Sequence, residues 1–210
     1  MSTHRFREAA GELLTHEMSS LAQLVRSYTV ALAAKSRGGV QAGSGVIWHP
    51  DGLVVTNAHV ATRGRHTVTL PTGDRVHGEV IARDRDIDLA AVAIPVRGLH
   101  PAPLGEPAAL RPGSLTLALG HPLGVANALA LGIVHHVVRD DAGDPRWIAA
   151  DIQLAPGNSG GPLVDASGRL VGINAMIVSG LGAAIPVDVV ANFLNATVGR
   201  SAWSTEMWAA

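Results

Sequence analysis

The chain is divided into many short hydrophobic runs by turn-forming residues, and this pattern limits the choice of fold more than any other feature. The 210 residues include 24 Gly and 12 Pro, and both residue types commonly end strands or form turns. Hydrophobic residues make up 47% of the chain and charged residues only 16%. The chain can therefore bury a large core, which excludes disorder as its main state. The pattern predicts an all-β protein.

The strand-like runs form two groups on either side of a proline-rich segment. The first group comprises residues 28–33, 46–48, 53–56, 67–70, 76–82 and 88–92. The second comprises residues 115–119, 129–138, 147–154, 163–164, 170–178 and 183–185. Six strands in each group predict two antiparallel barrels or sandwiches with a cleft where they meet. We expect domains at 28–100 and 115–186, joined by a linker at 101–114.

The two ends of the chain show helical rather than strand periodicity. Apolar residues from Phe6 to Val25 recur at helical spacing, which predicts an amphipathic helix within an N-terminal segment, 1–27. A second helix is expected from Val187 to about Val198, within a C-terminal helix and tail, 187–210. We expect no membrane span, and no secretory signal is visible. The expected location is the cytoplasm, unless the sequence is part of an exported protein.

Charge and composition exclude several classes of partner and site. Lys and Arg total 16 and Asp and Glu total 17, so no basic field predicts nucleic-acid binding. The chain has no Cys, which excludes disulfides and thiolate sites. No His spacing typical of a metal site occurs, and His135 and His136 are predicted to face opposite sides of a strand. The sequence indicates no metal and no cofactor.

One serine lies within a cluster of glycines, in the segment Gly157-Asn158-Ser159-Gly160-Gly161-Pro162-Leu163. Such a loop can expose a hydroxyl and direct backbone N–H groups at one point, although a plain hairpin turn would also explain it. The segment matches the nucleophile elbow of α/β-hydrolases, but these enzymes carry their catalytic His after the Ser. The last His here is His136, so a catalytic base must precede Ser159.

A candidate base and a candidate acid both lie in the first group of strands. His59 follows the apolar run Leu53 to Val55, where its side chain could be held at a cleft edge, although a structural His would read the same way. Asp88 directly precedes the apolar run 89–92, and a carboxylate there needs a donor such as an imidazole N–H. Asp84 and Asp86 are the competing carboxylates in a charged, solvated turn.

Six short blocks between about Tyr28 and Val198 resemble, in their order, the protease domain of HtrA/Deg-type, trypsin-like serine proteases. The blocks are Gly43-Ser44-Gly45-Val46-Ile47, Thr56-Asn57-Ala58-His59-Val60, Asp88-Leu89-Ala90-Ala91-Val92, Leu119-Gly120-His121-Pro122-Leu123-Gly124, Gly157-Asn158-Ser159-Gly160-Gly161-Pro162-Leu163 and Gly172-Ile173-Asn174. The resemblance implies two six-stranded antiparallel β-barrels and a His-Asp-Ser triad of His59, Asp88 and Ser159. The chain ends soon after these blocks, so we expect no PDZ domain.

The resemblance also implies an oxyanion hole and a substrate pocket. The oxyanion hole would be formed at Gly157, Asn158 and Ser159, and the residues implied for substrate binding are Leu154, Pro156, Met176, Ile177 and Val178. Because the pocket residues are apolar, we expect cleavage of extended or unfolded polypeptides after small or medium aliphatic residues. Ala155 replaces the Asn usual in relatives, which leaves open whether the loop before Ser159 is preformed.

Two further questions stay open at this stage. The alternative to a protease is a catalytically idle module of the same fold that binds peptides or acts as a chaperone. The N-terminal segment, Phe6 to Val25, could join three copies into a homotrimer, as in relatives, or fold back on its own barrel.

Overall fold

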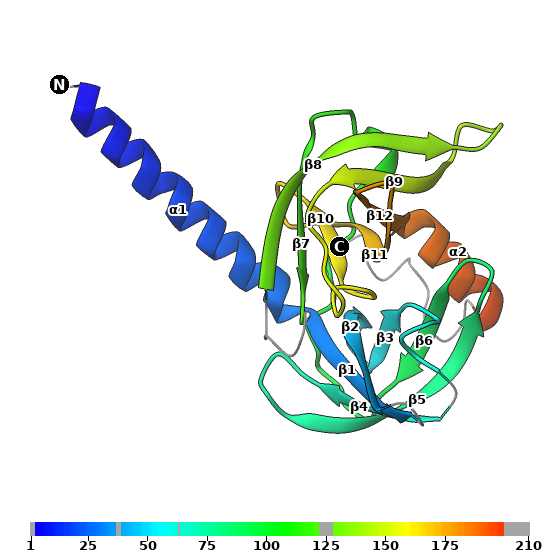
Figure 1. Ribbon diagram of the computed structural model, residues 1–210. Coiled ribbons are helices and arrows are strands. Elements are labelled where there is room, and N and C mark those ends of the chain that lie inside the picture. Colours follow the sequence, from blue (N-terminus) through cyan, green and yellow to red (C-terminus); the bar gives the residue numbers. More distant parts are fainter. Residues whose placement is uncertain (1–2, 37–38, 63, 122–127, 200–210) are drawn as a thin grey trace.

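The structure is a computed structural model that describes residues 3–36, 39–62, 64–121 and 128–199. Pro122 to Gly124 of the fourth sequence block and the tail from Arg200 therefore lie outside the described residues. The strands form two closed barrels, as Figure 1 shows. The prediction of two six-stranded antiparallel β-barrels is confirmed.

The first barrel is built from the N-terminal half of the chain. Its strands pair in the order β1-β2-β3-β6-β5-β4. They are β1 (Thr29–Ser36), β2 (Gly39–His49), β3 (Leu53–Thr56), β4 (Arg65–Thr69), β5 (Arg75–Asp84) and β6 (Leu89–Ala93). All residues of β3 are buried. His59 follows this strand directly and thus extends from a fixed support.

The second barrel pairs its strands in the order β10-β11-β12-β9-β8-β7. They are β7 (Leu115–Gly120), β8 (Ala128–Arg139), β9 (Pro145–Asp151), β10 (Pro162–Asp165), β11 (Leu170–Val178) and β12 (Leu181–Pro186). Along the chain, a short 3-10 helix, η1 (Pro107–Ala109), separates the last strand of the first barrel from the first strand of the second. The strands of one barrel end at Ala93 and those of the other begin at Leu115, so we propose 28–100 and 115–186 as the domain limits.

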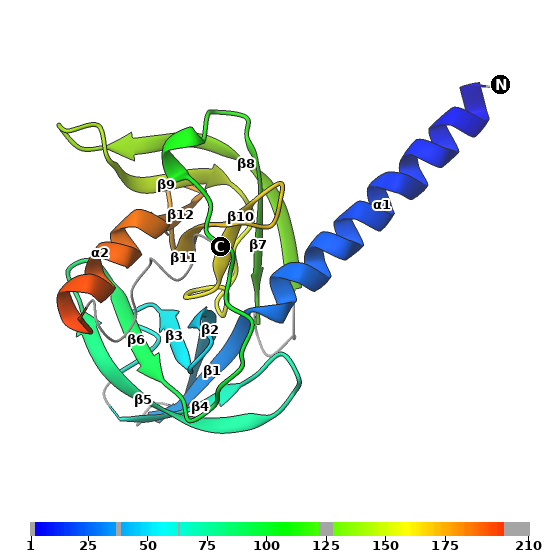
Figure 2. The ribbon, with the colours of Figure 1, turned by 180° about the vertical axis from the view of Figure 1, so that it is seen from behind.

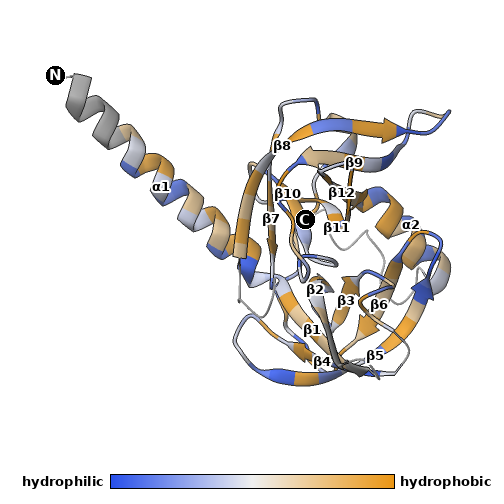
Figure 3. Ribbon diagram, in the orientation of Figure 1, coloured by the Kyte–Doolittle hydropathy of each residue, from blue (hydrophilic) through white to orange (hydrophobic). Residues whose placement is uncertain are grey.

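The hydrophobic residues of the two barrels form a continuous core between them. One buried cluster joins residues of the first barrel, such as Val30 and Val54, to residues of the second, such as Leu119 and Ile173. A smaller cluster around Ile148 and Leu163 lies within the second barrel. Figure 3 shows the hydrophobic residues concentrated along the strands of both barrels. The barrels are therefore held in one fixed arrangement, which the site between them requires.

Two helices flank the barrels. In α2 (Val187–Thr197), Val190, Phe193 and Leu194 are buried in the shared core. Near the C-terminal end of α1 (Thr3–Ser27), Val25 is 0% exposed. The rest of α1 extends away from the barrels in both Figure 1 and Figure 2.

Strand β2 is longer than the sequence predicts. The expected strand covers only residues 46–48, whereas β2 begins at Gly39 and pairs with β1 as far as Ser36↔Gly39. The small residues serve packing, because a Cβ on Gly45 would lie 2.6 Å from the Leu32 side chain. The extra length brings Ser44 into the strand, opposite Ala31.

The prediction that His135 and His136 face opposite sides of a strand is wrong. The pairing of β8 with β9 shifts between Val134 and His136, which marks a β-bulge. The bulge interrupts the alternation of side chains, so both imidazoles are exposed and their Nδ1 atoms lie 3.1 Å apart. Within the described residues, no group of three or more potential metal ligands is found.

Candidate active site

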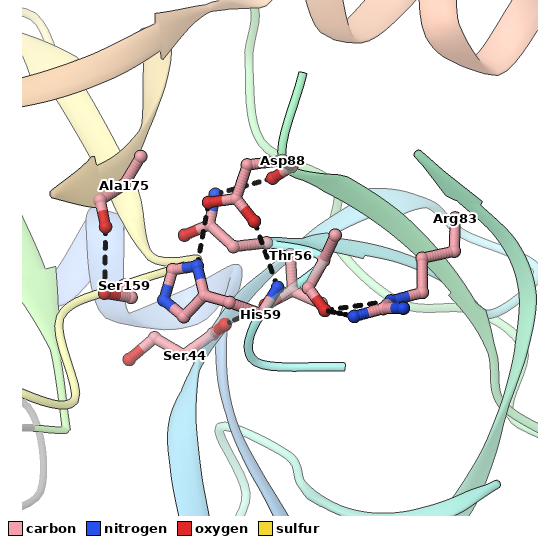
Figure 4. A network of polar contacts seen from close by, with 9 residues as sticks. Ser44, Thr56, His59, Arg83, Asp88, Ser159 and Ala175 are labelled. Atoms are coloured by element: carbon pink, nitrogen blue, oxygen red, sulfur yellow. Dashed lines mark hydrogen bonds and ion pairs between the residues drawn. The ribbon is translucent and has the colours of Figure 1, made fainter. Parts of the chain in front are cut away.

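Three loops bring together the residues that the sequence singles out. His59 lies in the loop after β3, Asp88 directly precedes β6, and Ser159 lies in the loop between β9 and β10. Figure 4 shows the His59 ring between Asp88 and Ser159, with one nitrogen on the Asp88 side and the other on the Ser159 side. Residues far apart in the sequence, from both barrels, thus meet at one point.

Asp88 binds His59 through both of its carboxylate oxygens. Its Oδ2 lies 2.7 Å from Nδ1 of the His59 ring, and its Oδ1 accepts the backbone N–H of His59 at 3.0 Å. The backbone of Asp88 has φ 55°, in the left-handed region that residues other than Gly seldom occupy. Such backbone conformations are often retained at functional sites because the surroundings enforce them.

The loop around His59 is fixed by further bonds to the same barrel. The Asp88 carbonyl accepts the backbone N–H of Ala58 at 3.1 Å and the side-chain amide of Asn57 at 3.0 Å. The Arg83 guanidinium donates two hydrogen bonds to the Ala58 carbonyl, from Nε at 2.9 Å and from Nη2 at 2.5 Å. The imidazole therefore extends from a loop whose backbone is anchored directly before it.

The Ser159 hydroxyl donates a hydrogen bond to the Ala175 carbonyl at 3.1 Å. Ala175 belongs to β11 of the second barrel. The backbone around Ser159 is held by several bonds: its carbonyl accepts the N–H of Ser44 at 2.8 Å, and the next N–H, of Gly160, donates to the Asn174 carbonyl at 2.8 Å. The loop is thus attached to both barrels.

The four residues before Ser159 form a type II turn. Asn158 donates its N–H to the Ala155 carbonyl at 2.9 Å, and Gly157 has φ 108°. Pro156 and Gly157 occupy the positions of this turn that favour Pro and Gly. Within the described part of the chain, the N–H groups of Gly157 and Ser159 have no hydrogen-bond acceptor. The turn therefore leaves two backbone donors unused beside the hydroxyl.

A cavity of about 280 Å³ lies beside Ser159. Four of the residues predicted to contact substrate line it: Leu154, Pro156, Met176 and Ile177. Val178 is not among the lining residues; it pairs with Leu181 at the end of β11. Ala155, Asn158 and Ala175 also line the cavity. No charged residue lines it, so the cavity suits an uncharged side chain.

His121, which directly follows β7, is a nearby histidine with a shifted pKa. Burial lowers its pKa from the usual 6.5, and the positive charge of Arg26 on α1 lowers it further. Its backbone N–H donates to Ser44 Oγ at 3.1 Å. His121 thus stays neutral to lower pH than an exposed histidine, in direct contact with a residue that holds the Ser159 loop.

Two participants are missing from the sequence-based set of site residues. Ala175 supplies a carbonyl, which any residue type could supply, so no sequence signal marks it. Ser44 stands between two glycines in a block that the resemblance includes, and that position could have pointed to it.

A further observation concerns membranes: no helix of the described residues is long and apolar enough to span one.

Comparison with known proteins agrees with this geometry. Residues 43–173 match the family described as trypsin-like peptidase domain. The chain is 39% identical over 170 residues to "Serine protease HTRA2, mitochondrial" of Bos taurus, which covers 77% of this chain and 37% of that protein. It is also 39% identical over 161 residues to "Putative serine protease HhoB" of Synechocystis sp., covering 71% of this chain and 38% of that protein.

The solved structure of the HtrA-type protease AlgW with a tripeptide is similar, with a TM-score of 0.78 and 30% identity over 86% of this chain and 64% of that one. This chain spans less than two fifths of the length of the two curated relatives above. The chain belongs to the trypsin-like peptidase family, and HtrA-type serine proteases are among its relatives.

Proposed function

We propose that the protein is a serine endopeptidase that cleaves extended or unfolded polypeptides through His59, Asp88 and Ser159. The observation that carries this proposal is the 2.7 Å contact between the Asp88 carboxylate and His59 Nδ1, with Ser159 on the other side of the ring (Figure 4). A plain structural histidine would not need a half-buried carboxylate on one side of its ring and a loop hydroxyl on the other. The relatives named as serine proteases support the same activity.

The chemistry follows from the tautomer that Asp88 selects. The carboxylate accepts a hydrogen bond from Nδ1–H, which keeps the proton on Nδ1 and leaves Nε2 as a base for the Ser159 hydroxyl. Ser159 Oγ attacks the peptide carbonyl as its proton passes to Nε2, and the imidazolium then donates that proton to the leaving amine. Water attacks the acyl-enzyme in the same way, its proton passing to Nε2, and Ser159 regains a proton as the acid product leaves.

The unused N–H groups of Gly157 and Ser159 form the oxyanion hole in this mechanism. The positive φ of Gly157 sets the direction of the Pro156–Gly157 peptide, since type I and type II turns differ by a half rotation of this peptide. Asn158 was also expected here, but its N–H is bonded to the Ala155 carbonyl, so it supplies no donor. Two donors in a preformed loop match what an oxyanion requires.

The site also accounts for recognition of a peptide backbone. In the residues described, β11 pairs with β12 along one edge, and Met176, Ile177 and Val178 are exposed. An extended substrate can pair with this segment as an added strand. The substrate N–H nearest the cleaved bond then competes for the Ala175 carbonyl, which releases the Ser159 hydroxyl toward His59.

The cavity beside Ser159 sets the specificity in this proposal. Its apolar walls, Leu154, Met176 and Ile177, and its volume of about 280 Å³ suit Val, Ala, Ile or Leu before the cleaved bond. A peptide library profiled by mass spectrometry tests this directly. Preference for Lys, Arg, Asp or Glu at that position would contradict the assignment of the pocket.

The central experiment separates a protease from an idle peptide-binding module. We expect a fluorophosphonate probe to label the wild-type protein covalently and the Ser159→Ala variant not at all, and only the wild type to cleave a denatured protein. Peptide binding without labelling or cleavage by the wild type would favour the binding module instead.

We also propose that the protruding part of α1 joins copies of the chain into a homotrimer. Leu13 and Leu14 are 62% and 64% exposed on this helix, and the helix extends well beyond the barrels (Figure 2). Light scattering should give three times the mass of one chain, and Leu13→Glu with Leu14→Glu should lower it to one. A monomeric wild type would refute this assembly.

A further inference from the structure

Ser44 lies on the first barrel, yet its polar groups bind the loop that carries Ser159. It belongs to β2 and is 0% exposed. Its N–H donates to the Ser159 carbonyl at 2.8 Å, and its hydroxyl donates to the Gly157 carbonyl at 2.7 Å. The hydroxyl also accepts the His121 N–H at 3.1 Å. A buried serine with this many partners has an orientation set by the fold.

The two bonds from Ser44 hold the peptides on either side of the Ser159 N–H. That N–H belongs to the peptide between Asn158 and Ser159. The preceding peptide carries the Gly157 carbonyl, which the Ser44 hydroxyl binds, and the following peptide carries the Ser159 carbonyl, which the Ser44 N–H binds. The two bonds fix the positions of both ends of the intervening peptide. Its own carbonyl, of Asn158, accepts the Gly161 N–H at 3.0 Å, so a rotation of this peptide would break that bond.

Ser44 also connects the Ser159 loop to the loop of His59. The Thr56 hydroxyl, three residues before His59, donates to the Ser44 carbonyl at 2.6 Å. Gly160 makes this approach possible, since a Cβ there would lie 2.1 Å from both the Ser44 carbonyl oxygen and Thr56 Oγ1. Figure 4 shows Ser44 and Thr56 beside the His59 and Ser159 side chains. One residue thus links the two halves of the site.

We infer that Ser44 is a positioning residue of the oxyanion hole: its hydroxyl, by binding the Gly157 carbonyl, holds the Ser159 N–H in the direction that meets the oxyanion. The inference rests on the proposed protease function and assigns a role to a residue of the other barrel. Ser44 does not touch the reacting atoms; it acts through the loop. Its effect should therefore appear in the transition state and not in substrate binding.

The variant Ser44→Ala tests this inference, because it removes the hydroxyl and keeps the backbone bonds. We expect kcat to fall about 10- to 100-fold, less than the 10²- to 10³-fold typical of losing an oxyanion donor outright. KM should stay within about twofold of wild type. A peptide boronate, whose tetrahedral adduct occupies the oxyanion hole, should bind weaker by the same factor as the loss of kcat. Ser44→Cys, which keeps a weak S–H donor, should recover part of the lost kcat and part of the lost boronate affinity.

Tyr28→Phe provides a matched control at a distance from Ser159. The buried Tyr28 hydroxyl donates to the Gly168 carbonyl at 2.6 Å, so this variant also removes one hydroxyl bond between the barrels. Burial raises the pKa of Tyr28, as does nearby Asp165, so the hydroxyl remains a donor. Tyr28→Phe should lower thermal stability as Ser44→Ala does while leaving kcat and boronate affinity unchanged.

A second readout needs no activity. Amide hydrogen exchange measured by NMR should become faster in Ser44→Ala at Asn158 and Gly161, whose N–H groups bond to the Ala155 and Asn158 carbonyls. Exchange at these two amides should stay unchanged in Tyr28→Phe. If the wild type neither cleaves peptides nor reacts with a fluorophosphonate, the protease proposal itself fails. If the wild type is active but Ser44→Ala keeps its kcat and boronate affinity, the role of Ser44 is refuted. Failure of both Ser44 variants to fold, when Tyr28→Phe folds, would also overturn it.

Discussion

His59 and Asp88 are held by contacts within the first barrel, whereas the loop of Ser159 is held by strands of both barrels. Asp88 binds the ring and backbone of His59, and Arg83 binds the Ala58 carbonyl directly before His59. The Ser159 loop instead depends on Ser44 of one barrel and Asn174 of the other. The acid–base pair can therefore form within one barrel, while the nucleophile loop needs the two barrels in their correct arrangement.

The largest expected effect tests the His59–Asp88 pair, which is held within the first barrel. Asp88→Asn should lower kcat by about 10⁴-fold, because the amide favours the wrong tautomer of His59 while the fold stays intact. Asp86→Asn is the matched control: Asp86 is exposed, and its N–H donates to Asp84 Oδ1 in a turn. Steady-state kinetics on a peptide substrate measures both. Equal losses in the two variants would contradict the assignment of Asp88.

The next effect tests the turn before the nucleophile. Gly157→Val should lower kcat by about 10²- to 10³-fold, because a β-branched residue disfavours the φ of 108° and misdirects an oxyanion donor. Gly143→Val introduces a comparable strain at φ 89° in a turn with open space around it. Both variants should lose stability in urea unfolding, but only Gly157→Val should lose kcat. Wild-type turnover in Gly157→Val would refute a preformed oxyanion loop.

A third variant tests whether the His59–Asp88 pair depends on the contact of the Ser159 loop with the first barrel, by disturbing that contact at Gly160. A Cβ on Gly160 would clash with Ser44 and Thr56 at φ 82°, so Gly160→Ala should destabilise the fold by about 3 kcal/mol. Gly73→Ala, at φ 95° with open space, should cost only about 1 kcal/mol. In the folded Gly160→Ala protein, the downfield Nδ1–H proton of His59 should persist in NMR spectra while activity is lost. Loss of that signal would show that the pair depends on the junction.

The smallest expected effect concerns pH and the contact between His121 and Ser44. Burial lowers the pKa of His121 in the folded protein below the usual 6.5. Between this lowered pKa and the pKa of about 6.5 in the unfolded chain, the unfolded chain binds more protons than the folded one. The free energy of unfolding should therefore fall as the pH drops through and below about 6.5. His121→Asn, which binds no proton, should show a shallower fall in urea titrations across this range. Other groups, such as Asp188 with its raised pKa, are common to both proteins. Identical slopes would exclude His121 as a contributor.

The fold could be predicted because it depends on local patterns, and the meeting of the three proposed catalytic residues was implied by the resemblance of six ordered blocks to HtrA-type proteases. Short apolar runs such as Leu53–Thr56 predict buried strands, and the glycines around Ser159 indicate an unusual loop. The preference for Asp88 over Asp84 and Asp86 relied on its place before an apolar strand, and the structure brings its carboxylate to His59. These signals lie within a few residues of one another, where sequence patterns are most informative.

Features that depend on contacts between strands could not be predicted. Residues 39–45 are rich in Gly and have weak strand propensity, but pairing with β1 overrides this preference. The β-bulge at His135 follows from the register with β9, which the sequence of β8 alone does not reveal. Ser44 is informative only once the position of the Gly157 carbonyl is known. In each case the partner lies far away along the chain.

The contact of Ser44 with the Ser159 loop has a consequence for the newly made chain. The groups that hold His59 against Asp88 all lie in the first barrel, but the Ser159 hydroxyl comes beside them only when the second barrel has packed against the first. Hydrolytic power would then arise only once the whole molecule has closed. A nascent or damaged copy would then leave neighbouring proteins intact.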